Sequence, residues 1–487
     1  MVSLGARLLL GGCTRLLLGG CTVLLLGGCA VLSLGGCAGL NRRPMPLHPY
    51  ANAMFGLRAE KPPLPELTET SDVGAYISYA LRNNPGVEAA FQNYVAALER
   101  IPQVTALPDP RLSYRYYIQE VETRVGPQEH AIGLSQTLPW FGKLALQGEI
   151  ASSKAEAVRE RFEAKKDTLV AEVIDAYLEY YHLGRAIAVV QGNRDLVQHL
   201  ERVARTRYGA GAANHPDVIR AQVELGVLEN QLASLKDRAG PFVARLNASL
   251  NRRQTIAIPF PTSAKVVPLG ASDADVLSWI ASSNPDLRAL RHEMASARAA
   301  GDRAEKDFYP DLTLGVDYIA TGDARMGGVS GSGDDAVIAG ISLNIPFARG
   351  KYRAAVREAK ARGRSAALQR SDLMNRFQAE AATALFRLRD AERQIDLYQD
   401  TLLPKARESL NTTQSAYSSG NATFTDLVDA QRVLLSFELS YERSLTDHGQ
   451  WRAALERLVG RNLPAKMKPE TPQKEQADDP DDDDSDK

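Results

Sequence analysis

The sequence lacks several features on which common protein functions depend. All four cysteines fall within the first 37 of its 487 residues, so residues 38–487 contain no thiol for a metal site or a nucleophile. The seven histidines are scattered, with no close pair at helical spacing. After residue 40 no stretch approaches the ~18 consecutive apolar residues of a membrane-spanning helix. We therefore expect no enzymatic activity, no catalytic residues, no metal site and no cofactor.

Net charge is also small. The formal net charge is −1 at pH 7, which gives no reason to expect nucleic-acid binding. Much of the negative charge lies in one C-terminal run, where seven aspartates stand between positions 478 and 486. Such a block repels itself, so we predict a disordered acidic tail over residues 464–487. Without this tail, the rest of the chain is mildly basic.

The first 40 residues carry the tetrad Leu-Gly-Gly-Cys four times, at a spacing of eight. They are apolar, contain two arginines and end before a polar stretch, so we interpret residues 1–40 as an export signal and residues 41–66 as an N-terminal extension. The tetrad resembles the bacterial lipobox, whose cysteine is diacylated and becomes the new N-terminus. Cys29 and Cys37 are the lipidation candidates, and a plain signal sequence or a membrane anchor is the alternative. Alanine follows both cysteines, which by resemblance to bacterial sorting rules favours the outer membrane.

One pattern occurs twice in the body of the chain. A tyrosine is followed by a glycine, an aspartate and an Ala-Gln pair at the same spacings in both copies. Each copy joins a long heptad-patterned stretch to a second helical one, so the chain looks like two fused copies of one helical-hairpin unit. The first copy contains Tyr208, Gly211, Asp217, Ala221 and Gln222, and the second contains Tyr417, Gly420, Asp426, Ala430 and Gln431.

The two halves can be aligned beyond this motif. Asn84-Pro85 corresponds to Asn284-Pro285 with an offset of 200 positions. Each half contains a helical segment, two short alternating stretches, and a long helix followed by a turn and another helix. We therefore predict a two-fold internal repeat, with residues 67–270 as the first structural repeat and residues 271–463 as the second.

Apolar and polar residues alternate in four short stretches, near residues 111–119, 130–138, 311–319 and 336–345. A period of two indicates β-strands with one apolar and one polar face. We expect loops at residues 120–129 and 321–335. Such strands are long enough to cross a bilayer, but the edges of an open four-stranded sheet would be unpaired in lipid, so other subunits would have to close it. A soluble four-stranded sheet packed on helices is the alternative.

After each strand pair the pattern becomes helical for an unusual distance. From position 142 to Tyr208, a rise of ~1.5 Å per residue gives about 100 Å, several times the ~30 Å core of a bilayer. Apolar residues recur at alternating steps of four and three, which is the 3.5-residue period of a left-handed coiled coil. We predict helical hairpins over residues 142–250 and 350–460, the second interrupted at Pro404, and we expect both to stand outside the membrane.

Taken together, these features resemble the TolC family of outer-membrane efflux proteins over roughly residues 67–463. The resemblance rests on the duplicated tip motif, the two Asn-Pro entries, and the junctions from strand to helix at residues 138–143 and 345–351. It implies a mainly α fold with a small β part. Three copies would form a homotrimer with a 12-stranded transmembrane β-barrel in outer-membrane lipid and a coiled-coil helical barrel in the periplasm.

The same resemblance implies a function and partners. Such a channel is the exit duct of a tripartite efflux system and passively conducts substrates across the outer membrane. Its helix tips dock onto a periplasmic membrane-fusion adaptor and an inner-membrane pump, here of the RND type. The alternative from another class is a periplasmic coiled-coil adaptor or a structural tether. An adaptor would place one helical hairpin within a Gly-rich lipoyl-like sheet, whereas this chain has two hairpins and two strand pairs.

Matching the motif to the family places a periplasmic tip or gate in the two turns. The tip-closing network falls on Asp217 and Tyr417, and a ring of pore carboxylates falls on Asp426 and Asp429. Ala422 stands where the family often has a basic residue. The alternative is structural: Asp217 and Asp426 would cap helices, the two glycines would form turns, and the two tyrosines would pack. Asp429 lies inside its helix with no capping role and is the better candidate for a pore acid. The full set is Tyr208, Gly211, Asp217, Tyr417, Gly420, Asp426 and Asp429.

Overall fold

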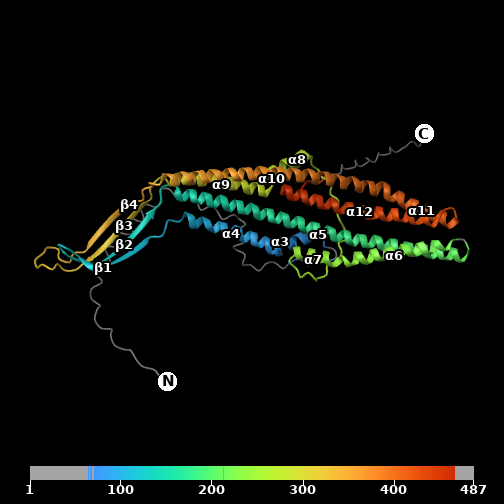
Figure 1. Cartoon of the computed structure of the whole chain (residues 1–487), viewed down its shortest axis with the longest axis horizontal. Helices are drawn as coiled ribbons and strands as arrows, with labels where there is room; N and C mark the ends of the chain where they lie inside the picture. Colours follow the sequence, from blue (N-terminus) through green and yellow to red (C-terminus); the bar gives the residue numbers. More distant parts are fainter. Residues whose placement is uncertain (1–63, 65, 69–70, 212, 467–487) are drawn as a thin grey trace, which may run out of the picture. The chain divides into compact units, whose positions relative to one another are not determined.

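The protein consists of long helices joined to one antiparallel sheet (Figure 1). The computed structural model describes residues 64, 66–68, 71–211 and 213–466. The predicted signal segment with Cys29 and Cys37, most of the N-terminal extension and the acidic run lie outside the described residues. The prediction of a mainly helical fold with a few strands is confirmed.

The first half contains two helices, two strands and three further helices. They are α3 (Val73–Asn83), α4 (Pro85–Thr105), β1 (Arg111–Thr123), β2 (Gly126–Leu138), α5 (Lys143–Gly209), α6 (His215–Asp237) and α7 (Ala239–Ser249). The helix α5 is 67 residues long and continuous. At ~1.5 Å per residue it separates the strands from the turn before α6 by about 100 Å.

The second half also begins with two helices and two strands. Its elements are α8 (Asp273–Ser283), α9 (Pro285–Lys306), β3 (Leu312–Thr321), β4 (Ala336–Leu343), α10 (Arg349–Leu397), η1 (Tyr398–Leu402), α11 (Leu403–Ser419) and α12 (Phe424–Val459). The interruption expected at Pro404 takes a specific form. A π-helical turn, η1, precedes the proline, which occupies the first turn of α11, where its missing N–H is not needed.

The two Asn-Pro pairs at the helix starts, Asn84-Pro85 and Asn284-Pro285, have the same structural role. Asn84 Oδ1 accepts a hydrogen bond from the backbone N–H of Gly86 at 2.8 Å, and Asn284 Oδ1 accepts one from Leu287 at 3.0 Å. Each asparagine therefore caps the helix that its proline begins. The side-chain amide of Asn84 also donates to the Ser249 carbonyl at the end of α7, and that of Asn284 donates to Leu458 in α12. Each entry is thus tied to the far end of its own half.

The sheet has the order β1-β2-β3-β4, with every neighbouring pair antiparallel. The prediction of a loop over residues 120–129 is wrong. The strands β1 and β2 continue through this segment and leave a turn of two residues between Thr123 and Gly126. In this extended hairpin Glu120 and Glu122 both form ion pairs with Arg325 from the loop after β3, at 2.8 and 3.2 Å.

The start of the predicted tail also needs correction. We placed it at residue 464, but Gly270 N–H donates to the Pro464 carbonyl at 3.1 Å, and Ala465 pairs with Leu269. The backbone N–H of Lys466 donates to Pro268 at 2.9 Å. Apolar Leu463, buried against α8 and α12, carries the chain into this short pairing before the charged segment begins.

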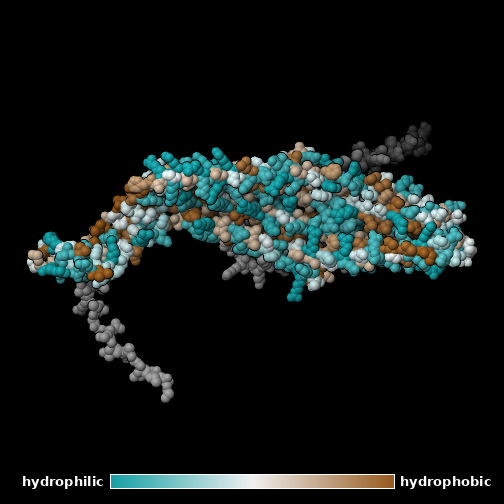
Figure 2. Space-filling model, viewed as in Figure 1, coloured by the Kyte–Doolittle hydropathy of each residue, from teal (hydrophilic) through white to brown (hydrophobic). Residues whose placement is uncertain are grey.

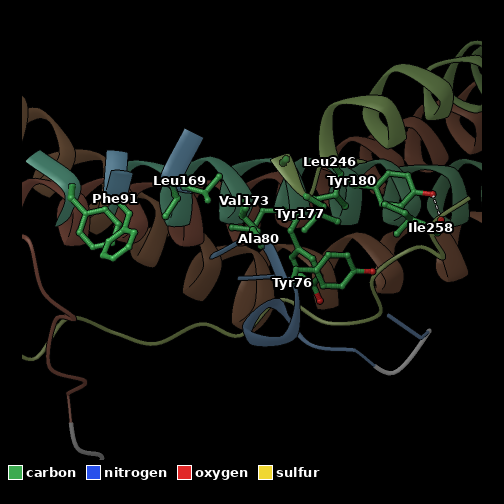
Figure 3. Close-up of a cluster of buried hydrophobic side chains, with 14 of the residues drawn as sticks. Tyr76, Ala80, Phe91, Leu169, Val173, Tyr177, Tyr180, Leu246 and Ile258 are labelled. Atoms are coloured by element: carbon green, nitrogen blue, oxygen red, sulfur yellow. Dashed lines mark hydrogen bonds between the residues drawn. The ribbon is translucent and has the colours of Figure 1, made fainter. Parts of the chain in front are cut away.

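A large apolar core lies where α3, α4 and α7 pack on α5 (Figure 3). The rings of Tyr76 and Tyr177 meet edge to face at 5.2 Å. Tyr180 buries its ring and donates its hydroxyl proton to the Ile258 carbonyl at 2.7 Å. This core holds the segment between the two halves against the middle of α5. No helix in the described part of the chain combines the length and the apolar composition needed to cross a membrane.

Candidate functional site

One face of the sheet is apolar and exposed on all four strands. The register aligns its side chains in rows: Leu112 pairs with Leu134, which pairs with Val316, and Tyr114 pairs with Ile132, which pairs with Tyr318. These residues are exposed, as are Val337, Ile341 and Leu343 of β4. Hydrophobic residues gather over the strands in Figure 2. An exposed apolar surface of this size needs an apolar environment or a partner.

The opposite face of the sheet is polar. Arg115 of β1 forms an ion pair with Asp317 of β3 at 2.7 Å, across β2. Thr137 and Thr313 share a hydrogen bond of 3.0 Å on neighbouring strands. Within the described residues, β1 and β4 each have one edge without a partner strand. A sheet with an apolar face, a polar face and two open edges is incomplete by itself.

The sheet is anchored to the helices through a buried lysine. Lys143, at the start of α5, is buried, and its Nζ lies 2.8 Å from Asp311 and 3.6 Å from Asp307. Asp311 also accepts a hydrogen bond from the backbone N–H of Trp140 at 2.8 Å. We did not predict this role, although Lys143 lies in the junction at residues 138–143 that carries the family resemblance.

The helix tips lie at the other end of α5. Gly211 follows α5 with φ of 68°, and Gly420 ends α11 with φ of 82°. Residues that have a Cβ rarely adopt this left-handed backbone conformation, so glycine suits both turns. The turn at Gly420 is closed by a hydrogen bond from Asn421 N–H to the Ala416 carbonyl at 2.8 Å.

The two motif tyrosines have different environments. Tyr208 is 47% exposed, whereas Tyr417 is 4% exposed. Tyr417 packs edge to face on Phe424 at 5.6 Å, and the guanidinium of Arg207 lies over its ring at 4.7 Å. Because Arg207 belongs to α5 and Tyr417 to α11, this cation–π contact joins the two hairpins.

Asp217 affects the pKa of Tyr417, although no hydrogen bond joins the two side chains among the described residues. Burial and, secondarily, the charge of Asp217 raise the pKa of Tyr417, while Arg207 works to lower it. The Tyr417 hydroxyl has no hydrogen-bond partner among the described residues. The partnership of Asp217 and Tyr417 in tip closure therefore stays a prediction.

The motif position of Asp429 holds an arginine in the first copy. Arg220 donates from Nη1 to Thr425 Oγ1 at 2.6 Å, which joins α6 to the start of α12. Its guanidinium also lies 4.0 Å from Asp217. Asp429 itself is exposed. The contrast of Arg220 with Asp429 was visible in the aligned motifs, but only the structure shows that Arg220 bridges the two tips.

Asp426 has a structural use that Asp429 lacks. It forms a reciprocal capping box with Thr423: its carboxylate accepts from the Thr423 N–H at 2.9 Å and from the Thr423 hydroxyl at 2.7 Å, and its own N–H donates back at 3.2 Å. These hydrogen bonds from Thr423, by its side chain first and then its backbone, lower the pKa of Asp426. Capping alone thus accounts for an acid at this position.

Polar contacts lock the hairpins together just behind the tips. Glu224 of α6 is 4% exposed, and Arg432 of α12 donates to it from Nε at 3.2 and 3.1 Å and from Nη2 at 2.5 Å. Gln431 is fully buried and donates to Asn193 of α5 at 3.0 Å. In the described part of the chain, no cluster of three or more His, Cys, Asp or Glu side chains is placed to hold a metal ion.

Comparison with known proteins identifies the family. A family model described as outer membrane efflux protein matches residues 76–252 and 276–461. Nodulation protein T of Rhizobium leguminosarum bv. trifolii is 24% identical over 411 residues, covering 79% of this chain and 85% of its own. The cobalt-zinc-cadmium resistance protein CzcC of Cupriavidus metallidurans is 22% identical, covering 80% and 89%. The solved outer-membrane channel OprN aligns with a TM-score of 0.66 and 20% identity, covering 82% and 94%.

An apolar sheet and a set of long helices with polar tips are the two parts of a channel-forming outer-membrane protein. The chain belongs to the outer membrane efflux protein family, because the family model matches well over half of it. It is a channel of the outer membrane with its helical part in the periplasm, and it serves as the exit duct of a tripartite efflux system. The predicted family, function and location are confirmed. Since members of this family are channels, the chain is neither an enzyme nor a periplasmic adaptor or tether.

Proposed function

We propose that three copies of the chain close into a homotrimeric channel with a 12-stranded β-barrel and a coiled-coil helical tunnel. The observation that carries this proposal is the sheet, with its apolar rows on one face, polar residues on the other, and open edges at β1 and β4. Pairing β4 of one copy with β1 of the next would satisfy both edges. Outer-membrane lipid would cover the apolar rows, and the polar face would line the pore.

Two neighbouring positions on β4 test the facing of the sheet. Ile341 pairs with Leu314 in the apolar rows, and Ser342, the next residue, pairs with Thr313 on the opposite face. An arginine on a lipid face costs ~2–4 kcal/mol near the bilayer centre, whereas one in the pore does not. We expect Ile341→Arg to reduce the yield of heat-resistant trimer extracted with detergent and Ser342→Arg to leave it near normal. Equal yields, or a monomer released without detergent, would exclude the proposed barrel.

The domain plan follows from the same proposal. Residues 67–270 and 271–463 would each be one structural repeat, contributing one strand pair and one helical hairpin. The two separate matches of the family model, one in each half, support this division. So do the equivalent capping and tying bonds of Asn84 and Asn284.

We further propose that the two tips form the periplasmic gate, built from Tyr208, Gly211, Asp217, Tyr417, Gly420, Asp426 and Asp429. Asp429 is assigned as the main pore acid, since it is exposed and takes no part in a capping box. Three copies would place like charges around the opening and attract cations. We expect Asp429→Ala to lower cation selectivity in single-channel recordings more than Asp426→Ala does. The reverse order would remove this assignment.

The partners would be a periplasmic membrane-fusion adaptor and an inner-membrane pump of the RND type, both met at the tips. Relatives that align over most of their own length support membership in such a system, and one of them is named for cobalt, zinc and cadmium resistance. A photo-cross-linking residue at exposed Ser415 of α11, near the tip, should capture the adaptor in cells. A site on the exposed apolar face of β4, such as Ile341, is the matched control and should not.

Lipidation at Cys37 or Cys29 is the final part of the proposal. A lipid anchor would hold the mature N-terminus at the outer membrane. Labelling with radioactive palmitate, followed by mass spectrometry of the mature N-terminal peptide, distinguishes the two sites. Replacing both cysteines by serine should abolish the label, and a label that persists would contradict the assignment.

A further inference from the structure

The first half of α10 carries positive charge that the described chain does not neutralise. Residues 349–376 contain nine lysines and arginines but only two acids. Both acids pair within the helix, Glu358 with Arg362 at 2.6 Å and Asp372 with Arg376 at 3.3 Å. The other seven cations of this segment form no ion pair with any described residue. Four of these seven make up what we call the basic stripe: Arg353, Arg357, Lys360 and Arg364.

The basic stripe occupies one face of α10. Its members follow one another at steps of four, three and four, which places them on one side of a coiled-coil helix. All four are exposed. Arg357, Lys360 and Arg364 line one surface recess together with Ser365 and Leu368. Four adjacent cations on one line are suited to an extended chain of negative charges.

The described chain ends beside this helix. Lys466 N–H donates to the Pro268 carbonyl at 2.9 Å, and Ala465 pairs with Leu269. The backbone N–H of Leu269 in turn donates to Glu392 of α10 at 3.2 Å. The C-terminal segment therefore leaves the structure next to Glu392.

Glu392 and the basic stripe lie on the same face. Glu392 follows Arg364 by 28 residues and Arg357 by 35, which are four and five heptads. In a coiled-coil helix, residues separated by whole heptads point the same way. Leu385, one heptad before Glu392, belongs to the core cluster that α10 shares with α8. The stripe thus continues, toward the sheet, the side of α10 on which Leu385 and Glu392 lie.

The remaining sequence has the length to reach the stripe. At ~1.5 Å per residue, Arg364 lies about 42 Å along α10 from Glu392 and Arg353 about 58 Å. An extended chain spans up to ~3.3–3.6 Å per residue. The four aspartates at 481–484 follow Lys466 by 15 to 18 residues, which gives them a reach of about 50–60 Å. At full extension this run therefore reaches Arg364 with all four aspartates and Arg353 only with the last of them.

We propose that the acidic run at residues 478–486 binds the basic stripe of its own chain. Each contact would join exposed charges and be weak alone, but seven aspartates tethered to the same molecule act at an effective concentration of about millimolar. Salt screens such contacts, so the bound state is reversible. Bound, the run would shield this side of α10 from other polyanions, including anionic lipid headgroups.

A photo-cross-linking residue at Ser485 tests the proposal in the full-length protein purified in detergent. Mass spectrometry would identify the cross-linked peptides at low salt and in 0.5 M NaCl. The stripe variant is Arg357→Gln, Lys360→Gln and Arg364→Gln together. The matched control removes the same charge from other positions of the segment through Lys351→Gln, Arg362→Gln and Arg376→Gln. All six positions are exposed, so neither variant disturbs the core.

We expect cross-links within residues 353–364 of the same chain, reduced at least fivefold by the stripe variant and by 0.5 M NaCl. The control variant should keep more than half of the yield. Cross-links to added phosphatidylglycerol, to a second copy or to other parts of the chain would overturn the proposal, as would a yield that the stripe variant leaves unchanged. Since the readout does not depend on conduction, its failure would leave the channel proposal intact.

Discussion

Replacing Arg432 alone should destabilise the tip end of the protein more than replacing both Arg432 and its ion-pair partner Glu224. Glu224 is buried, and three of its contacts come from the Arg432 guanidinium. With Arg432→Met, the carboxylate stays buried without a counter-charge. With Glu224→Gln added, the remaining group is neutral and the loss is smaller.

The magnitude follows from the burial of the two groups. Breaking a fully buried ion pair costs ~3–5 kcal/mol because an uncompensated charge remains. The Arg432 side chain is 57% exposed, so water already solvates part of it and can reach the carboxylate after substitution. We therefore expect Arg432→Met to cost roughly 1–3 kcal/mol and the double variant about 1 kcal/mol or less.

Amide hydrogen exchange in α6 and α12 measures this change in free energy, since a tenfold change in the equilibrium constant for local opening corresponds to ~1.4 kcal/mol. The matched control is Arg389→Met, which breaks a 2.6 Å pair with Asp273 in which both side chains are about half exposed. It should change exchange by less than about threefold, since surface pairs contribute ~0–1 kcal/mol. If Arg432→Met behaved like this control, or if the double variant exchanged as fast as the single one, the reasoning would fail.

Three further predictions concern single side chains. Asp426→Ala should lower the Tm through loss of the capping box with Thr423, on the order of 1–2 °C in a chain of this size, with no such effect from Asp429→Ala; calorimetry decides. Burial, with help from the charge of Glu163, raises the pKa of Asp167 from 3.8 to about 6. Between about pH 4 and 6 the folded state therefore binds a proton at Asp167 that the unfolded state has released, and at pH 7 the buried charged carboxylate destabilises the folded state. Asp167→Asn should then stabilise by roughly 1–2 kcal/mol at pH 7 after allowance for partial exposure, with the gain fading as the pH falls from 6 to 4 in denaturant titrations. Burial lowers the pKa of His448 below 6.5 despite Glu392, so the unfolded state binds more protons and stability should fall as the pH drops below 6.5; His448→Gln should flatten this dependence in melts at pH 7.5 and 5.5.

Local pattern was enough to predict most of the fold. Short segments carry the alternation around Leu112 and Leu312 and the heptads of α5. These patterns can therefore be recognised in the sequence before any contact is known. The Asn84 and Asn284 entries, likewise, act first on the helix that follows them. Alignment of the halves then supplied the order of elements.

Contacts between distant segments could not be read in this way. Residues 120–129 carry charges typical of a loop, yet Arg325, about 200 positions away, pairs with Glu120 and Glu122 and the strands continue. Tyr208 and Tyr417 occupy the same motif position, but among the described residues only Tyr417 has an arginine from another helix stacked over its ring. Burial of Glu224 likewise depends on Arg432, and nothing in either local sequence marks the pair.

The divergence of the two tips has an electrostatic reason in the trimer that we propose. Were both motif copies to carry an acid at the position of Asp429, six like charges would crowd the opening, each raising the others' cost of ionisation. Arg220 in the first copy replaces three of these charges by their opposites and also binds Thr425 of the neighbouring tip. The remaining acids can then attract cations while the ring as a whole stays closable. Ala422, where a basic residue would be expected, is consistent with this division, because Arg207 and Arg220 already bring positive charge to the tips from the first hairpin.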